Sequence, residues 1–365
     1  MPTRNRKLII VVPSRKFKFS GIYNVSEDLH TGLENEKIEH EMVLVVTSKK
    51  YAEPEFSTNK VALANLSGIF SSEKIFIIPD DYILINHLHS NKIYNQNVII
   101  WSHYFKGHRL LFSEYINRPR EKTFFDFGSK LSHDFLPYAI WKFFFHDYVR
   151  YLKNNVLISQ SVWSCLLLNR VYGLNCQSII PLPIDRNYFR VNQASDKKCL
   201  IFIGGKQDTD LNKLDHVLTI INDIDPKIKY YAIGDRQTCD HFVQTFRHDL
   251  IFKQNVSRSD LQDLIARMTF TINPIYIGTF EMFPIESLMC GTPTITFIQP
   301  FLEVTGTSKM ISSIHSDSDV KNKVKDWLLG NIGDERERIK KLIIDRMWNN
   351  RIARDIFQLA RDEFP

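Results

Sequence analysis

The sequence predicts an α/β chain of two domains, each built on a parallel β-sheet. Short apolar runs rich in β-branched residues recur between longer amphipathic stretches, which is typical of strands and helices that alternate in parallel sheets. Both halves of the chain begin in this way. The length of 365 residues exceeds one typical core and suits two domains. A cleft between the two domains is therefore expected.

The first half of the chain begins with a strand, a loop and a helix. Residues 7–12 are expected to form a buried strand, and residues 22–36 to form a helix. A second helix is predicted over residues 161–172, because its apolar residues have helical spacing and Gly173 follows where a helix would stop. The other strands predicted in this half cover residues 41–46, 74–78, 97–101 and 154–158.

The second half repeats this pattern after a polar stretch that we predict to be a linker, residues 190–198. Its strands are expected over residues 199–203, 228–233, 250–252, 269–273 and 292–297. Its clearest helices are expected over residues 212–223 and 259–267, the second with Ser257 or Ser259 as N-cap. Charged, periodic segments at 319–329, 335–346 and 349–363 close the chain. We predict an N-terminal domain (1–190), a C-terminal domain (191–348) and a last helix (349–365) that packs back on the N-terminal domain.

The composition is that of a globular protein in a reducing compartment. Apolar residues make up 44% of the chain, charged residues 24%, and the net charge of +6 is modest. The five cysteines are scattered, without a C-x-x-C pair or a disulfide-dense spacing. No apolar run reaches the about 20 residues that span a bilayer, and residues 8–12 are too short for a signal-peptide core. We predict a cytoplasmic protein, and the basic residues between 4 and 18 leave peripheral membrane contact open.

The most informative run is Gly278-Thr-Phe-Glu-Met-Phe-Pro-Ile-Glu-Ser-Leu-Met-Cys-Gly-Thr-Pro-Thr-Ile295, which reads as a loop, a helix and a strand. A helix that begins near Pro284 points its free N–H groups back toward the loop, where a diphosphate would lie. Glu286, expected in the first turn, can accept hydrogen bonds from paired ribose hydroxyls. The alternative is an ordinary helix followed by a Gly-Thr-Pro turn.

This run resembles the donor-binding signature of family-4 retaining glycosyltransferases, E-G-F-G-x-P-x-x-E-A-M-A-C-G-x-P-V. The residues that match it in place are Phe280, Glu286, Cys290, Gly291 and Pro293, while Pro284 and Met289 stand one place later. The first glutamate of the signature lies beside the transferred sugar in that family, and here it falls on Gly278. Glu281 is our candidate to replace it. The resemblance implies the GT-B fold, two Rossmann-like domains with parallel sheets facing a central cleft.

Further segments resemble the same family at the expected distances. Residues 19–29 are similar to the glycine loop and first helix of the acceptor domain, with Gly21 at the close approach. Residues 178–189 resemble the junction between domains. Residues 201–206, followed by Lys213, resemble the strand and loop that supply two cations to the donor diphosphate, here Lys206 and Lys213. Each feature also has an ordinary interpretation, a plain turn at Gly21 or a solvated lysine.

In the N-terminal half, His103 directly follows a predicted strand, where the family often has a histidine near the reacting sugar. A neutral imidazole there could hydrogen-bond the sugar or the acceptor hydroxyl, although a histidine at a strand end is also often structural. His108 and Arg109 could reach the acceptor or a phosphate. The resemblance thus implies catalytic roles for His103, Lys213 and Glu281 and acceptor-binding roles for His103, His108 and Arg109. It implies donor-binding roles for Gly21, Gly205, Lys206, Lys213, Gly278, Thr279, Phe280, Glu281, Met282, Phe283 and Glu286.

No metal or cofactor is predicted. D-x-D triplets, which hold a cation in GT-A transferases, occur at residues 208–210, 223–225 and 317–319, but triplets of this kind arise easily by chance. The nucleotide-diphosphate sugar, UDP-linked among the candidates, is then a co-substrate of metal-independent hexosyl or pentosyl transfer.

The resemblance implies a retaining transferase that builds a glycan or glycoconjugate on a glycan or lipid-linked acceptor. One alternative is a phage-type enzyme that modifies a hydroxymethylated base in DNA, and another is a non-catalytic sugar-nucleotide-binding protein, which the missing first glutamate favours. The aromatic, basic run at residues 136–153 leaves three interpretations open: a helix lying on a membrane, a surface that stacks on bases, or a helix buried against the acceptor domain. The oligomeric state is not predicted.

Overall fold

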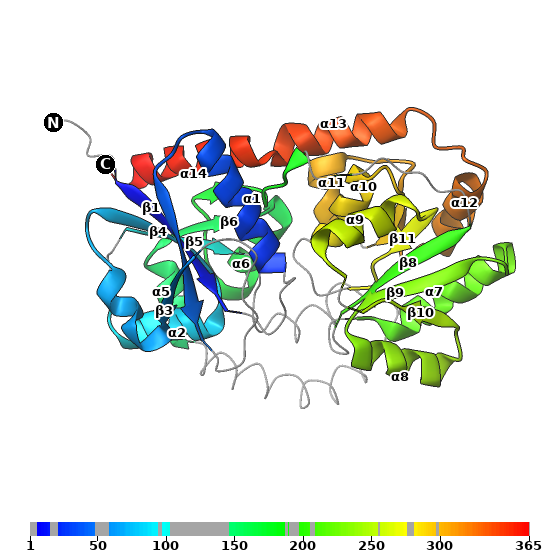
Figure 1. The fold of residues 1–365 in the computed structure, drawn as a ribbon, viewed down its shortest axis with the longest axis horizontal. Coiled ribbons are helices and arrows are strands. Elements are labelled where there is room, and N and C mark those ends of the chain that lie inside the picture. The colour runs from blue at the N-terminus through cyan, green and yellow to red at the C-terminus, as the bar shows by residue number, and fades with distance from the viewer. Residues whose placement is uncertain are drawn as a thin grey trace. The chain divides into compact units, whose positions relative to one another are not determined.

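The chain folds into two compact units, shown as a ribbon in Figure 1. One unit combines Met1–Ile184 with Asn349–Pro365, and the other is Asp185–Trp348. The computed structural model describes residues 6–14, 21–47, 58–93, 97–102, 146–186, 189, 197–204, 209–254, 256–275, 281–296 and 299–364. Each unit is described by itself below.

The first unit is built on a parallel sheet of seven strands, in the order β3-β2-β1-β4-β5-β6-β7. Its strands are β1 (Lys7–Pro13), β2 (His40–Val46), β3 (Asn59–Ala62), β4 (Lys74–Pro79), β5 (Val98–Ser102), β6 (Val156–Ser159) and β7 (Ser178–Ile179). Every pair is parallel, with Leu8 opposite His40 across β1 and β2. The five strands that the sequence predicts are confirmed, and β3 and β7 are additional short edge strands.

The helices of the first unit begin and end at recognisable signals. They are α1 (Gly21–Asn35), the 3-10 helix η1 (Leu63–Ile69), α2 (Tyr82–Ser90), α5 (His146–Lys153), α6 (Val162–Tyr172) and α14 (Asn349–Glu363). Ser161 caps α6 by accepting from the N–H of Ser164, and Gly173, with φ of 65°, ends it as predicted. Asp81 caps α2, a helix that the sequence analysis did not predict.

Along each strand of this sheet, successive side chains point to opposite faces, so alternate residues pack on the same side. Ile9 and Val11 belong to a buried cluster that also holds Tyr148 and Tyr151 of α5. Both tyrosines are fully buried, so within the described part of the aromatic run the interpretation of a buried helix is favoured. Residues 136–145 of that run lie outside the described residues.

Helix α14 packs along α1, as the red and blue helices of Figure 1 show. Its first residue, Asn349, donates its N–H to the carbonyl of Ile184 at 2.9 Å. Gly32 of α1 lies directly beneath this point, and a Cβ atom on Gly32 would lie nearer than 3.0 Å to the carbonyl oxygen of Asn349. The absence of a side chain at Gly32 therefore allows the two helices to approach.

Gly32→Ala is expected to lower the free energy of unfolding by about 1–3 kcal/mol, the usual cost of overpacking. The added methyl group meets backbone atoms of Asn349, which cannot rotate away as a flexible side chain would. Urea denaturation measures the change. Gly68→Ala is the control, because a Cβ atom on Gly68 meets nothing within 4 Å. Equal midpoints for the two variants would contradict the packing of α14 on α1.

The second unit is built on a parallel sheet of six strands, in the order β10-β9-β8-β11-β12-β13. Its strands are β8 (Lys198–Ile203), β9 (Lys229–Gly234), β10 (Leu250–Phe252), β11 (Phe270–Ile272), β12 (Thr294–Thr296) and β13 (Ile311–Ser313). All five pairs of neighbours are parallel. The five predicted strands are confirmed within one to two residues at each end, and β13 is an additional one.

The helices of the second unit pack against this sheet or against one another, and one of them contacts the edge strand β13. They are α7 (Leu211–Ile224), α8 (Arg236–Phe246), α9 (Arg258–Ala266), α10 (Met282–Met289), α11 (Gln299–Thr305), α12 (Asp317–Leu328) and α13 (Glu335–Met347). Of the two candidate N-caps for α9, Ser257 is the one used, since its hydroxyl accepts from the N–H of Asp260. Helices α8 and α11 were not predicted. The predicted fold class, α/β with two parallel sheets, is confirmed.

Three further observations concern the described part of the chain. None of its helices combines the length and the apolar character needed to cross a membrane. No group of three or more His, Cys, Asp or Glu side chains in it is arranged to hold a metal ion. The five cysteines are free thiols.

Candidate functional site

The candidate site of the second unit lies where the order of its sheet reverses. Strands β8 and β11 are neighbours, but the chain leaves β8 toward β9 and leaves β11 toward β12, in opposite directions. In open α/β sheets, ligands bind outside the carboxyl ends of the strands at such a switch point. The two segments that leave these ends, 204–210 and 273–281, include or adjoin most of the predicted donor-binding residues.

The two segments are held against each other. Thr209 and Ile275 form an antiparallel bridge, and the N–H of Asp210 donates to the carbonyl of Pro274 at 3.0 Å. Gly204 lies against Ile275 and Thr209, because a Cβ atom on it would be 3.0 Å from Cδ1 of Ile275 and 3.3 Å from Oγ1 of Thr209. The start of α7 and the residues that follow β11 are therefore held by one shared backbone framework.

Lys213 lies in the first turn of α7. Its backbone N–H donates to the carboxylate of Asp210, which caps the helix at 2.9 Å. The ammonium group lies 3.6 Å from Oδ1 of Asp317, and the side chain is 21% exposed. The structure thus places a partly sheltered positive charge at a helix N-terminus beside the switch point, where an anion is favoured.

Three titratable side chains near Lys213 are those of His216, His315 and Asp317. The other carboxylate oxygen of Asp317 lies 2.8 Å from Nε2 of His216, and this hydrogen bond is the main cause that lowers the pKa of Asp317. Burial lowers the pKa of His315, and the positive charge of Lys213 lowers it further. At neutral pH Asp317 is therefore ionised and His315 is neutral.

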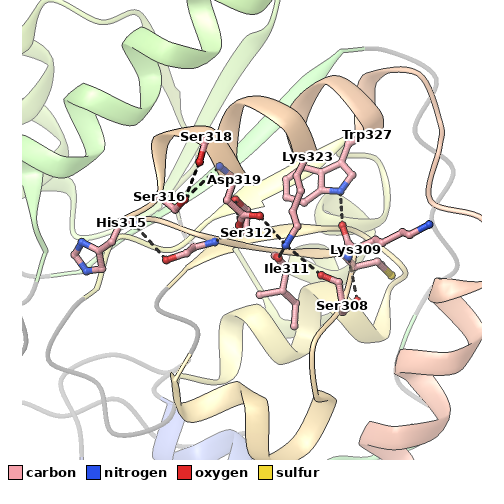
Figure 2. Close-up of polar contacts among 12 residues, drawn as sticks. Ser308, Lys309, Ile311, Ser312, His315, Ser316, Ser318, Asp319, Lys323 and Trp327 are labelled. Carbon is pink, nitrogen blue, oxygen red and sulfur yellow. Dashed lines mark hydrogen bonds and ion pairs between the residues drawn. The ribbon is translucent and has the colours of Figure 1, made fainter.

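A polar network holds the turn that carries His315 and the start of α12 (Figure 2). Oδ2 of Asp319 accepts from the hydroxyl of Ser312 at 3.0 Å and from the N–H of Ser313 at 2.9 Å. Lys323 pairs with the same carboxylate at 3.1 Å, and the indole N–H of Trp327 donates to the carbonyl of Lys309. These contacts join β13 to α12. Asp319, a member of a D-x-D triplet, thus serves to connect the two elements.

Helix α10 starts at a different residue from the predicted one. It begins at Met282 rather than near Pro284, so Glu286 lies in the second turn and not in the first. Pro284 is the third helical residue, where the backbone N–H that proline lacks would have no partner within the helix. Glu281 occupies the N-cap position, and its side chain makes no capping hydrogen bond.

The side chains of α10 anchor the helix in the core. Phe283 stacks on Phe202 of β8 with ring centroids 5.3 Å apart, and the hydroxyl of Thr271 on β11 donates to that of Ser287 at 3.0 Å. Glu286 is buried, with 6% of its surface exposed. Because the ring of Phe283 is used in packing, its backbone N–H is the group that remains for a ligand at this helix end.

The structure distributes the predicted site residues over three sets. Lys213, Glu281, Met282, Phe283 and Glu286 belong to the second unit, at or near the starts of α7 and α10. Gly21 is the first residue of α1 in the first unit. The predicted residues that lie outside the described part of the chain are His103, His108, Arg109, Gly205, Lys206, Gly278, Thr279 and Phe280.

The sequence analysis assigned no binding or catalytic role to His216, His315 or Asp317. Their relation to Lys213 depends on the packing of α12 beside α7, about 100 residues later in the chain. The sequence signal at this place is the D-x-D triplet at 317–319, a pattern that also arises easily by chance. In the structure its first aspartate pairs with Lys213 and its second joins β13 to α12.

The first unit also has a groove, which does not lie at the carboxyl ends of the strands of its sheet. It has a volume of about 350 Å³ and is lined by Asn97, Val98, Lys153, Asn154, Asn155, Val156, Gln177 and Phe364. Most of these residues lie at the amino ends of β5 and β6, whereas ligands of open α/β sheets bind at the carboxyl ends. The switch point of the second unit remains the candidate site.

Several of the solved structures that this chain resembles are glycosyltransferases. Sucrose-phosphate synthase from Thermosynechococcus elongatus superposes with a TM-score of 0.72 at 12% identity, over 98% of this chain and 99% of that one. An alpha-glucosyltransferase in complex with UDP and a 13-mer DNA containing a HMU base gives 0.66 at 11%, over 97% and 99%. The chain has the GT-B fold.

A third GT-B structure extends the comparison. The lipopolysaccharide outer core galactosyltransferase WaaB superposes with a TM-score of 0.57 at 13% identity, over 98% of this chain and 99% of that one. No protein-family model matches the sequence, and no curated protein is significantly similar to it. At these identities the likeness establishes the fold alone.

Proposed function

We propose that this GT-B protein is a glycosyltransferase that moves a sugar from a nucleotide-diphosphate donor to an acceptor hydroxyl. The observation that carries the proposal is the position of Lys213 at the start of α7, beside the switch point and next to the segment that leads into α10. A cation at a helix N-terminus is what a diphosphate requires. The similarity to glycosyltransferases over 98% of the chain supports the same function.

In the proposed mechanism, the C-terminal half binds the donor. Lys213 and Lys206 neutralise the diphosphate, on which negative charge grows as the glycosidic bond breaks. The N–H groups of Met282 and Phe283 face the same charge, and Glu286 accepts hydrogen bonds from the ribose. Two lysines supply the positive charge that a divalent cation provides in other transferases, so the reaction is proposed to be metal-independent.

The acceptor binds to the N-terminal half, past Gly21 and His103, with His108 and Arg109 further along its path. The leaving phosphate takes the proton from the acceptor hydroxyl, which places attack and departure on one face of the sugar and retains the anomeric configuration. Glu281, at the N-cap of α10, takes the place of the glutamate that the family signature has at 278.

A glycan or glycoconjugate, including a lipid-linked one, is the first acceptor class that we propose, in the cytoplasm or at the surface of a membrane. The similarity to WaaB supports it. DNA with a modified base is the second class, favoured by the alpha-glucosyltransferase that was crystallised with DNA and by the net charge of +6. Duplex binding that weakens steeply with salt would select DNA, because phosphate contacts release counterions.

The experiment that tests the function is a thermal-shift screen over nucleotide sugars, followed by product analysis with the best one. A ligand that binds only the folded chain stabilises it by about 2.7 kcal/mol when present at 100 times its Kd. One donor class should therefore raise Tm clearly, and the nucleoside alone should raise it less. A flat response to every nucleotide sugar would contradict the transferase and also a sugar-nucleotide-binding role.

A further inference from the structure

Two buried polar atoms at the switch point have no hydrogen-bond partner among the described residues. They are Oγ1 of Thr209, in the segment between β8 and α7, and Nδ2 of Asn273, directly after β11. Thr209 is 4% exposed and Asn273 is fully buried. The sequence analysis gave neither residue a role.

The orientation of the Asn273 amide follows from its one hydrogen bond. Its Oδ1 accepts from the N–H of Ile275 at 3.4 Å, and only the oxygen of the amide can accept. Nδ2 is therefore turned away from Ile275 with both of its N–H groups unused by described residues. The backbone beneath is fixed, because the N–H of Asn273 donates to the carbonyl of Ile295 at 2.9 Å.

Thr209, in the segment between β8 and α7, also has a backbone that is fixed by contacts. Its backbone forms the bridge to Ile275, and its hydroxyl lies beside Gly204. Thr209 and Asn273 thus both flank Ile275, one across the bridge and one along the chain. Two hydrogen-bonding side chains on rigid backbone are placed at the point where this sheet would bind a ligand.

A buried polar atom without a hydrogen-bond partner lowers the stability of the folded chain. A buried donor without a partner costs on the order of 1–3 kcal/mol, and valine or leucine would fill the same space without that cost. Folded proteins contain few such groups, and each one calls for an explanation. A ligand rich in acceptor oxygens, bound at the switch point, provides one.

We propose that Thr209 and Asn273 are donor-binding residues whose hydroxyl and amide groups donate hydrogen bonds to the diphosphate of the nucleotide sugar. The inference rests on the proposed function. A diphosphate has only acceptor atoms, so it matches a side-chain N–H and an O–H that have no partner in the part of the chain that the structure describes. These neutral donors act beside Lys213: they fix the position of the diphosphate without adding charge. Charge-assisted hydrogen bonds of this kind are about twice as strong as neutral ones.

Asn273→Leu and Thr209→Val test the inference through two effects of opposite sign. Each removes an unsatisfied group, so the ligand-free Tm is expected to stay the same or rise. Each also removes a hydrogen bond to the diphosphate, so the Kd for the nucleoside diphosphate is expected to rise about 10-fold. Calorimetry with UDP, ADP, GDP, CDP and dTDP gives the Kd, and the matching nucleosides, which lack the diphosphate, should bind all variants equally.

Thr294→Val is the matched control. Thr294 also has a buried hydroxyl without a hydrogen-bond partner among the described residues, but it is the first residue of β12 and lies opposite Thr271, two residues before Asn273 on the neighbouring strand. Its replacement should leave the Kd unchanged. Thr209→Ser, which keeps the hydroxyl, should retain wild-type affinity, and the Thr209 pair of variants decides the matter if Asn273→Leu does not fold.

The two proposals fail in different ways. Wild-type protein that binds none of the five nucleoside diphosphates would overturn the donor site as a whole. Wild-type protein that binds one of them, with Thr209→Val and Asn273→Leu binding it equally well, would overturn the role of Thr209 and Asn273 alone. A lower ligand-free Tm with unchanged Kd would make both residues structural.

Discussion

Lys213→Met is expected to lower kcat for sugar transfer by about 100-fold or more, the scale of loss when one group that stabilises transition-state charge is removed. The charge on the diphosphate grows as the sugar leaves, so the loss should affect kcat more than KM for the donor. Initial rates with the donor found by thermal shift measure it. Lys213→Arg keeps the positive charge and should retain part of the activity.

The substitution should not unfold the protein. Methionine replaces the stem of lysine, and the partner carboxylate of Asp317 is 57% exposed, so no buried charge is left behind. Lys229→Met is the control: Lys229 is an exposed residue at the amino end of β9, away from the switch point. A Lys213→Met enzyme with activity within a few-fold of that of Lys229→Met would remove Lys213 from the proposed mechanism.

The regular part of the fold was accessible from the sequence because it depends on local pattern. Strand β1 is a run of apolar residues, and α6 carries both its N-cap, Ser161, and its stop, Gly173, in the sequence itself. By contrast, β13 has only one apolar residue, and its serines are satisfied by Asp319 of α12. Helix α8 is mostly polar and buries Thr238 and Cys239, so it offers few apolar residues from which to predict a helix.

The residues of the candidate site also differ in whether local sequence pattern predicts them. Lys213 and the segment before α10 were found because their spacing matches a known signature. The start of α10 was misplaced by two residues because proline fits the first turn at more than one position, and the sequence cannot choose between them. The significance of Thr209, Asn273 and Asp317 depends on burial and on partners brought by other elements, which spacing along the chain does not encode.

Gly234 allows the carboxyl ends of β8 and β9 to meet. Its φ is 110°, which side-chain-bearing residues rarely adopt, and a Cβ atom on it would lie nearer than 3.0 Å to the carbonyl oxygen of Ile203. That oxygen also accepts the N–H of Asp235 at 2.7 Å, and Asp235 caps α8. A side chain at this position would therefore force apart the strand ends that precede both α7 and α8.

Gly234→Ala is expected to lower the free energy of unfolding by about 2–6 kcal/mol, the sum of backbone strain and overpacking of about 1–3 kcal/mol each. Urea denaturation of the whole chain measures the loss. Gly330→Ala separates the two causes, because Gly330 also has a positive φ, 75°, but a Cβ atom on it meets nothing within 4 Å. The excess loss in Gly234→Ala then reports the contact with Ile203. If the two variants unfold at the same urea concentration, β8 and β9 do not approach as closely as described, and the framework that positions Lys213 is wrong as well.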